Sequence, residues 1–234
     1  MLAASKSFPD KGLSNSSFTT AEKGSHLGQA SFAIWLQLGM AYALLEATLW
    51  TPEGRLQILW MTLTTICILL FTLGGRYSAR EMGLARPSAA ASVWIVGGGL
   101  VLAGIIPVLA ALTGANSAPT HALPMHTAWQ YAIWTFVQQF ILQSFFYVRM
   151  ESLLGSRRAV FATAILFAAA HIPNPVLIFT TLLGGLFFCE MFRRYRNIFP
   201  LGIAHAVLGL TIAASFSDAV LHHMRVGIAY LHLH

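Results

Sequence analysis

The sequence alternates long apolar segments with short polar connections. Six of these segments reach the length of about 20 residues that a helix needs to cross a lipid bilayer. A shorter apolar run, Val160–His171, lies between the fourth and fifth segments and stops just before two prolines, which disfavour helix continuation. The pattern predicts an all-α fold, a polytopic transmembrane helical bundle of about seven spans. The long segments are Ser31–Trp50, Leu56–Leu73, Ala89–Leu112, Ala128–Val148, Val176–Phe192 and Ile198–Phe216.

Composition supports a single membrane domain. Hydrophobic residues make up 56% of the chain and charged residues only 9%, whereas a soluble domain carries about 25% charged residues. We therefore expect a membrane domain over residues 29–234. Residues 1–28 are rich in Ser, Thr and Gly, and this composition predicts a flexible N-terminal tail.

The positive charges mark one side of the membrane. The net charge is +6, but the arginines sit in short connections between apolar segments, so membrane topology explains the charge better than a nucleic-acid partner does. Every second connection is rich in arginine, and the intervening ones are nearly free of it. This alternation places the tail in the cytoplasm and the C-terminus outside. The arginines concerned are Arg76, Arg80, Arg86, Arg149, Arg157, Arg158, Arg193, Arg194 and Arg196.

Polar side chains inside apolar segments are the candidates for function. Gln138, Gln139 and Gln143 lie in the fourth long segment, His171 ends the short run, and His205 lies in the last span. Gln139 and Gln143 share one helix face. Polar groups at bilayer depth usually face the bundle interior, so we expect these segments to meet at one polar cavity. Amides that bridge helices and neutral, hydrogen-bonded imidazoles are the structural alternative.

Three further residues are expected to lie at this cavity. Phe167 precedes His171 by one helical turn, and Asn174 lies between two prolines, where it can also shape the turn. Glu46 lies inside the first span, where an unpaired carboxylate is costly, so a functional or paired role is expected for it. With Gln143, these residues form the expected lining. The sequence contains no serine in a nucleophile elbow and no zinc-protease H-E-x-x-H motif.

The order of these motifs resembles the CAAX protease and bacteriocin-processing (CPBP, or Abi) family of intramembrane proteases. That family carries E-E-x-x-x-R on one helix, F-x-x-x-H on the next and H-x-x-x-N on a later one. Phe167 to His171 matches the second motif, and His205 matches the third at its histidine, with Gly209 in place of the asparagine. The resemblance covers residues 128–216, and the stretch from Met82 to Leu84 is similar to the family's lead-in.

The first motif of the family is replaced in this chain. Gln138 and Gln139 stand where the family has its two glutamates, and Gln143 stands where it has arginine. The resemblance implies that His171 and His205 polarise water or stabilise an oxyanion. Gln139 would hold the position of the general base, together with Gln138, although an amide cannot act as a base.

The resemblance thus implies an intramembrane endopeptidase, a peptide hydrolase that cleaves membrane-associated protein substrates through an activated water. Either Glu46 reaches the cavity, or His171 is itself the base, or the chain no longer cleaves peptides. In the last case it is a pseudoprotease that binds a membrane partner. A small-solute transporter ranks behind both, because no duplicated halves are visible.

The expected partners are a membrane-anchored protein or peptide substrate and the lipid bilayer, and no nucleic acid. The sequence identifies no cofactor. We assign no metal site, because two histidines from different helices without a third ligand make a poor zinc site. The expected location is a bacterial inner (plasma) membrane, with the N-terminus in the cytoplasm.

Overall fold

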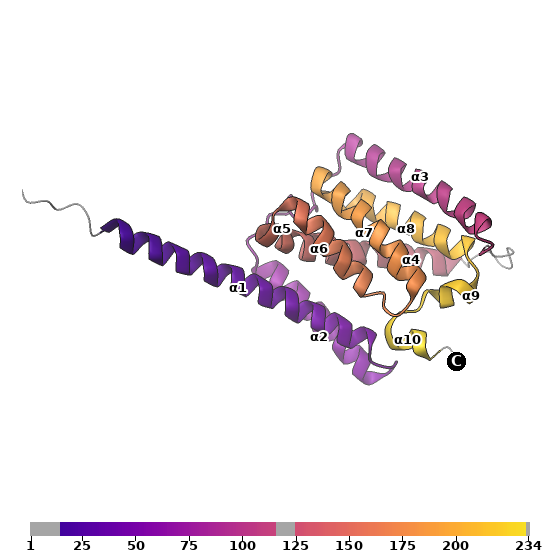
Figure 1. Ribbon diagram of the computed structural model, residues 1–234, viewed down its shortest axis with the longest axis horizontal. Helices are drawn as coiled ribbons and strands as arrows, with labels where there is room; N and C mark the ends of the chain where they lie inside the picture. Colours follow the sequence, from indigo (N-terminus) through magenta and orange to yellow (C-terminus); the bar gives the residue numbers. More distant parts are fainter. Residues whose placement is uncertain (1–14, 116–124, 233–234) are drawn as a thin grey trace, which may run out of the picture.

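The computed structural model describes residues 15–115 and 125–232, and the regular secondary structure in these ranges is helical (Figure 1). The all-α prediction is therefore confirmed. The first half contains α1 (Asn15–Leu49), α2 (Arg55–Gly74) and α3 (Ala89–Leu112). The central part contains α4 (Met125–Gln139), η1 (Phe140–Tyr147), α5 (Val148–Leu154) and α6 (Ser156–Ala169). The last part contains α7 (Pro175–Tyr195), α8 (Ile198–Ser215), α9 (Asp218–Leu221), η2 (His222–Met224) and α10 (Gly227–Leu231).

Five helices of the described chain are long and apolar enough to cross a membrane: Gly28–Leu49 within α1, and α2, α3, α7 and α8. The expected fourth span is one helical run divided among α4, η1 and α5. It changes pitch at η1, a π-helical segment in which the Val148 N–H donates to the Gln143 carbonyl. The number and direction of the crossings stay predictions.

The short apolar run Val160–His171 forms most of α6, which begins at Ser156 and ends at Ala169. Gly155, with φ +79°, separates it from α5, so the run does not continue back through Leu153. The chain then turns over residues 170–174, which include a cis bond between Ile172 and Pro173. The expected stop before the proline pair is confirmed.

Two expectations, on the N-terminal tail and on the loop arginines, need restating. The tail predicted over residues 1–28 lies outside the described residues up to residue 14, and α1 is already helical from Asn15. Its mobility and its cytoplasmic side stay predictions.

Arg149 was counted among the loop arginines, but it lies in α5 with a fully buried side chain. That assignment is wrong.

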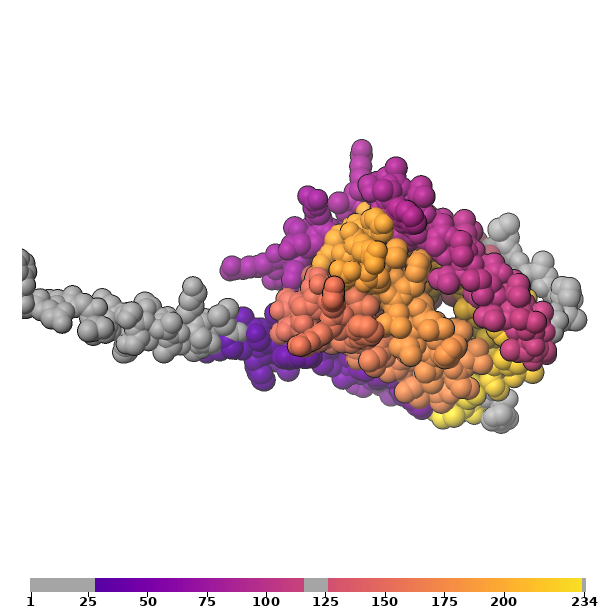
Figure 2. All heavy atoms as spheres, turned by 45° about the horizontal axis from the view of Figure 1, so that its top comes forward, coloured from indigo at the N-terminus to yellow at the C-terminus, as the bar shows by residue number. Residues whose placement is uncertain are grey.

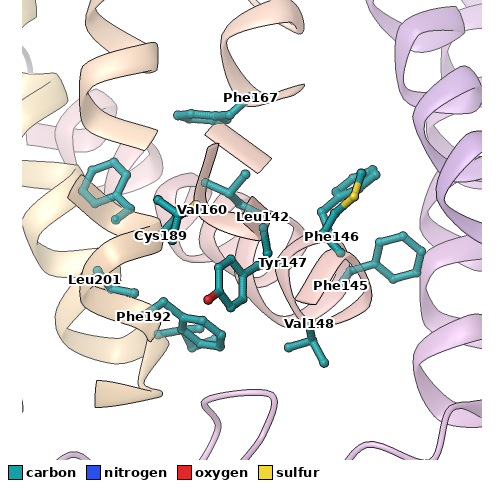
Figure 3. Close-up of a cluster of buried hydrophobic side chains, with 14 of the residues drawn as sticks. Leu142, Phe145, Phe146, Tyr147, Val148, Val160, Phe167, Cys189, Phe192 and Leu201 are labelled. Carbon is teal, nitrogen blue, oxygen red and sulfur yellow. The ribbon is translucent and has the colours of Figure 1, made fainter. Parts of the chain in front are cut away.

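The helices form a layer with a hairpin against one side. In Figure 1, α6, α7, α8 and α3 follow one another across the layer, α4 packs against α8, and α1 pairs with α2 along the edge. Figure 3 shows the aromatic cluster at the centre, where Tyr147 and Phe192 meet edge to face with ring centroids 5.4 Å apart. These rings bury the junction of η1, α5 and α7.

The loop before α3 is fastened to this core. The Met82 carbonyl accepts a 2.6 Å hydrogen bond from Ser144 Oγ, and the Gly83 carbonyl accepts one of 3.0 Å from the Ile198 N–H. Gly83 has φ +72° and lies against the Phe192 ring, so a side chain there would be strained and would collide. The stretch from Met82 to Leu84 thus fixes where η1, α7 and α8 meet.

Close helix contacts in the layer depend on small residues. A Cβ at Gly99 on α3 would lie 2.8 Å from the Ala204 Cβ on α8, and one at Gly202 would lie 2.5 Å from the Phe136 ring on α4. Without a hydrophobic driving force between helices in lipid, such close backbone approach supplies the packing energy.

Gly202→Ala should therefore lower stability, because its Cβ must displace the half-buried Phe136 ring. Overpacking of this kind costs about 1–3 kcal/mol. Gly104→Ala on α3 is the matched control, since its Cβ meets no atom within 4 Å and alanine favours helix. The measurement is the unfolding midpoint of each variant in detergent. Equal midpoints for the two variants would contradict the close α4–α8 contact.

Candidate functional site

A large cavity lies between the α1–α2 hairpin and the helical layer. Its volume is about 1270 Å³, and side chains from α1, α2, α3, α4, α6, α7 and α8 line it. Figure 2 shows the molecule hollowed between α3 and α7, both of which contribute lining residues. Most of the lining is apolar, so the few polar groups on it define where chemistry can occur.

His205 enters the cavity from α8. Its imidazole is 8% exposed and packs beside the rings of Phe188 and Phe167, with centroids 4.9 and 5.9 Å away. Asn197 sets the start of the helix, because its Oδ1 accepts from the Phe199 N–H and its Nδ2 donates to the Ala85 carbonyl. This cap fixes the rotation of α8 and hence the direction of His205.

A chain of side-chain hydrogen bonds leads to this imidazole. Gln143 Nε2 donates to Gln139 Oε1 at 3.3 Å, and Gln139 Nε2 lies 3.2 Å from His205 Nδ1. Both amides are fully buried. Because the Gln139 oxygen already accepts, its NH₂ group faces the histidine, and Nδ1 must accept. The direction of the chain therefore assigns the His205 proton to Nε2.

His171 presents the opposite arrangement. It follows the last turn of α6, and its Nδ1 lies 2.7 Å from the Phe167 carbonyl oxygen. A carbonyl only accepts, so Nδ1 carries the proton and Nε2 keeps its lone pair. The Phe167 ring also contacts the imidazole at 4.9 Å. His171 is thus a neutral acceptor at the cavity, and His205 is a neutral donor.

The structure brings together the residues expected to share one cavity. Gln138, Phe167, His171 and His205 all line it, and Gln139 lies directly behind His205. Sequence spacing placed Gln139 and Gln143 on one helix face, and their direct hydrogen bond agrees with that placement.

Three residues expected at the lining are not part of it. Gln143 is enclosed between Gln139 and Cys189. The Gln143 Nε2 atom donates to the Cys189 Sγ atom at 3.6 Å. Asn174 is fully buried as the cap of α7, with Oδ1 accepting from the Leu177 N–H. Glu46 accepts a 3.1 Å hydrogen bond from Trp50 Nε1 and also interacts with the hydroxyl of the lining residue Tyr42, but it does not itself line the cavity. Each is held by a local partner instead.

No carboxylate lines the cavity within residues 15–115 and 125–232. Two other acids, Glu190 and Glu151, are held by arginines near helix ends. Glu190 accepts from Arg193 and Arg194, and Glu151 pairs with Arg196. Among these residues, water activation by a glutamate therefore has no candidate that itself lines the cavity.

Arg149 is a buried group that sequence reasoning missed. Its guanidinium donates to Gln37 Oε1 at 3.0 Å and to the carbonyl of Phe71 at 2.7 Å, and it stacks 4.0 Å from the Phe145 ring centroid. Phe71 lies in the last turn of α2, where the helix dipole is negative. The side chain thereby joins the hairpin to the η1–α5 run.

Tyr131 lies near the start of the predicted span Ala128–Val148, where aromatic residues usually form a belt at the membrane surface. In the structure it lines the cavity together with Gln138, His205 and Gly209. The signal was a tyrosine two turns before Gln138, on the same face of α4.

The C-terminal segment, residues 217–231, closes the cavity next to His171. Asn174 Nδ2 donates to the carbonyls of Leu221 and Arg225, at 2.8 and 3.2 Å, and the Gly227 N–H donates to the Ile172 carbonyl at 2.8 Å. Met224 and Val226 line the cavity from this segment, which holds the turn that carries His171.

Comparison with known proteins supports the resemblance seen in the sequence. Residues 127–211 match the family model of the Rce1-like type II CAAX prenyl endopeptidases. The matched region contains Gln138, Gln139, His171 and His205, and it overlaps the expected core of 128–216 over residues 128–211. No curated protein and no solved structure matches the chain. The chain is therefore an integral membrane protein whose core is similar to a family of membrane proteases.

Asn174→Ala should destabilise the protein more than loss of a helix cap alone. It removes the α7 cap, worth about 1 kcal/mol, and leaves the carbonyls of Leu221 and Arg225 without their donor, at about 1–3 kcal/mol. We expect the free energy of unfolding in detergent to fall by about 2–3 kcal/mol.

Ser88→Ala is the control, since Ser88 caps α3 through a single bond from the Ala91 N–H. It should cost about 1 kcal/mol. Equal losses in the two variants would mean that Asn174 does not fasten the C-terminal segment.

Proposed function

We propose that this protein is an intramembrane endopeptidase that hydrolyses a membrane-anchored polypeptide with two neutral imidazoles and a water molecule. One observation carries the proposal. His171 and His205 come from different elements, line the same cavity and have complementary hydrogen-bonding states. The match to a family of CAAX endopeptidases supports the reaction class.

The chemistry assigns one role to each imidazole. His171 Nε2 takes a proton from water, and the resulting hydroxide adds to the carbonyl carbon of the peptide bond. The Nε2–H of His205 donates to the oxyanion that forms. The protonated His171 then returns its proton to the departing amide nitrogen, the C–N bond breaks, and a carboxylic acid and an amine result. No carboxylate of the enzyme is needed.

The cavity supports a membrane-anchored substrate. Its lining is mostly apolar and includes side chains such as Leu102, Ile105 and Phe187. The matched family is described by its prenylated CAAX substrates. We therefore propose a protein with a lipid-modified C-terminal region as substrate, with the lipid in the apolar part and the peptide beside the histidines. The proposed location is a bacterial inner membrane, with the N-terminus in the cytoplasm.

His171→Ala and His205→Ala should each lower kcat/KM by about 10²-fold or more, because each removes a group that acts on the transition state. The measurement is cleavage of a quenched fluorescent, prenylated CAAX peptide by purified protein in nanodiscs. His223→Ala is the control, since His223 is exposed and pairs with Asp218 outside the cavity. Activity that survives in both cavity variants would overturn the proposal.

A second candidate function is binding without cleavage, in which the protein holds or escorts a lipid-modified partner. The observation that favours it is the lack of a cavity-lining carboxylate in the described ranges, together with the engagement of Gln139 by His205. In this case wild-type protein binds the prenylated peptide and leaves it intact.

Gln139→Glu separates the two functions. A carboxylate at this position would accept the Nδ1 proton of His205 and convert its Nε2 from donor to acceptor. For the endopeptidase we expect cleavage to fall by about 10²-fold, the usual effect of losing one oxyanion donor. Gln130→Glu, on the exposed face of α4, is the control. Cleavage that arises only in Gln139→Glu, with none in wild type, would instead identify an inactivated protease and support the binding function.

A further inference from the structure

In the site, the Tyr131 side chain fills the space beside Gly209. Gly209 lies on α8 one turn after His205, at the position where the third motif of the resembling family carries asparagine. A Cβ built on Gly209 would fall inside the hydroxyl oxygen of Tyr131 and would lie 2.6 Å from its Cζ atom. The phenol of α4 therefore fills the volume that a side chain at position 209 would need.

The hydroxyl is available for a ligand. Within residues 15–115 and 125–232, the structure records no hydrogen bond from Tyr131 Oη to another group. The side chain is half-buried, and the residue lines the cavity. A phenol that is partly removed from water normally finds a hydrogen-bond partner. A bound molecule in the cavity would supply one.

Tyr131 is also placed to act on a bound molecule together with His205. α4 and α8 pack along their length, and Gln138 and Gln139 on α4 lie two turns after Tyr131. Tyr131, Gln138 and His205 all line the cavity. This wall thus offers two hydrogen-bond donors, the His205 N–H and the Tyr131 O–H. The Tyr131 hydroxyl lies beside Gly209, one helical turn after His205 on α8.

We infer that Tyr131 is a catalytic residue of this chain, whose hydroxyl donates a hydrogen bond to the peptide carbonyl that also receives the His205 N–H. In this arrangement, Tyr131 on α4 and Gly209 on α8 together replace the asparagine of the family pattern. The inference rests on the proposed function, since it names the second donor for the oxyanion of that reaction.

Tyr131→Phe removes only the hydroxyl and keeps the ring that packs on Gly209. It should lower kcat by about 10²-fold while KM changes by less than about threefold, because the donor acts mainly on the developing oxyanion. Tyr195→Phe, at the end of α7 and outside the lining, should match wild type. A wild-type kcat in Tyr131→Phe would overturn the inference.

A double variant tests directly whether a side chain at position 209 can replace the Tyr131 side chain. Tyr131→Ala should lose as much activity as Tyr131→Phe, and the double variant Tyr131→Ala with Gly209→Asn should recover at least about tenfold over Tyr131→Ala. Gly209→Asn alone should be unstable, because its side chain collides with the phenol. A double variant no more active than Tyr131→Ala would count against the inference.

A binding measurement separates this inference from the proposed function. The probe is a prenylated CAAX peptide with an N-methylated scissile amide, titrated by fluorescence polarisation into protein in nanodiscs. If wild type cleaves nothing but Tyr131→Phe raises the Kd of this probe by about fivefold or more, the hydroxyl binds the carbonyl and only the endopeptidase function fails. An unchanged Kd in that case would overturn the inference as well.

Discussion

The site depends on the chain of buried amide hydrogen bonds from Gln143 through Gln139 to His205. A buried amide without partners costs several kcal/mol in lipid, so an arrangement in which the amide donors meet acceptors is strongly favoured. The chain has one direction, and that direction fixes which nitrogen of His205 carries the proton. It also joins η1 to α8. The His205 imidazole is therefore a hydrogen-bond donor toward the cavity, because Gln139 on α4 donates to its other nitrogen.

The same constraint explains why the site is neutral. The resembling family places two glutamates and an arginine where this chain has three glutamines, and replacement of only one charge there would leave an uncompensated ion in a low-dielectric region. With all three positions neutral, no counter-ion is required. The remaining buried cation, Arg149, lies toward the end of α2, where carbonyl oxygens and aromatic faces stabilise it without an acid. The buried guanidinium thus lies at the joint between the hairpin and the bundle, not at the site.

Periodicity and motif order predicted much of this arrangement, and their limits are physical. The apolar segments predicted the helices, because length and hydropathy decide what can span a bilayer. The spacing of Phe167 and His171, and of Gln139 and Gln143, predicted shared faces, because helical geometry is local. The contacts of Arg149 with Phe71 and of Tyr131 with Gly209 were not predictable in this way, since each joins segments that are distant in the sequence. Asn174 and Glu46 were expected at the cavity, but a helix cap and a neighbouring indole hold them.

The replaced motifs bear on whether the site has decayed or has been rebuilt. Loss of a catalytic set by independent substitutions would leave voids and unpaired polar groups, because each removed side chain had partners. Here the volume released by glycine at position 209 is filled by Tyr131, and the amides pair with one another and with His205. Of the amide atoms in this network, the structure leaves Gln143 Oε1 without a partner. This complementary packing and pairing on α4, η1 and α8 agrees with the proposed function, in which a bound substrate would engage the Tyr131 hydroxyl and the two imidazoles.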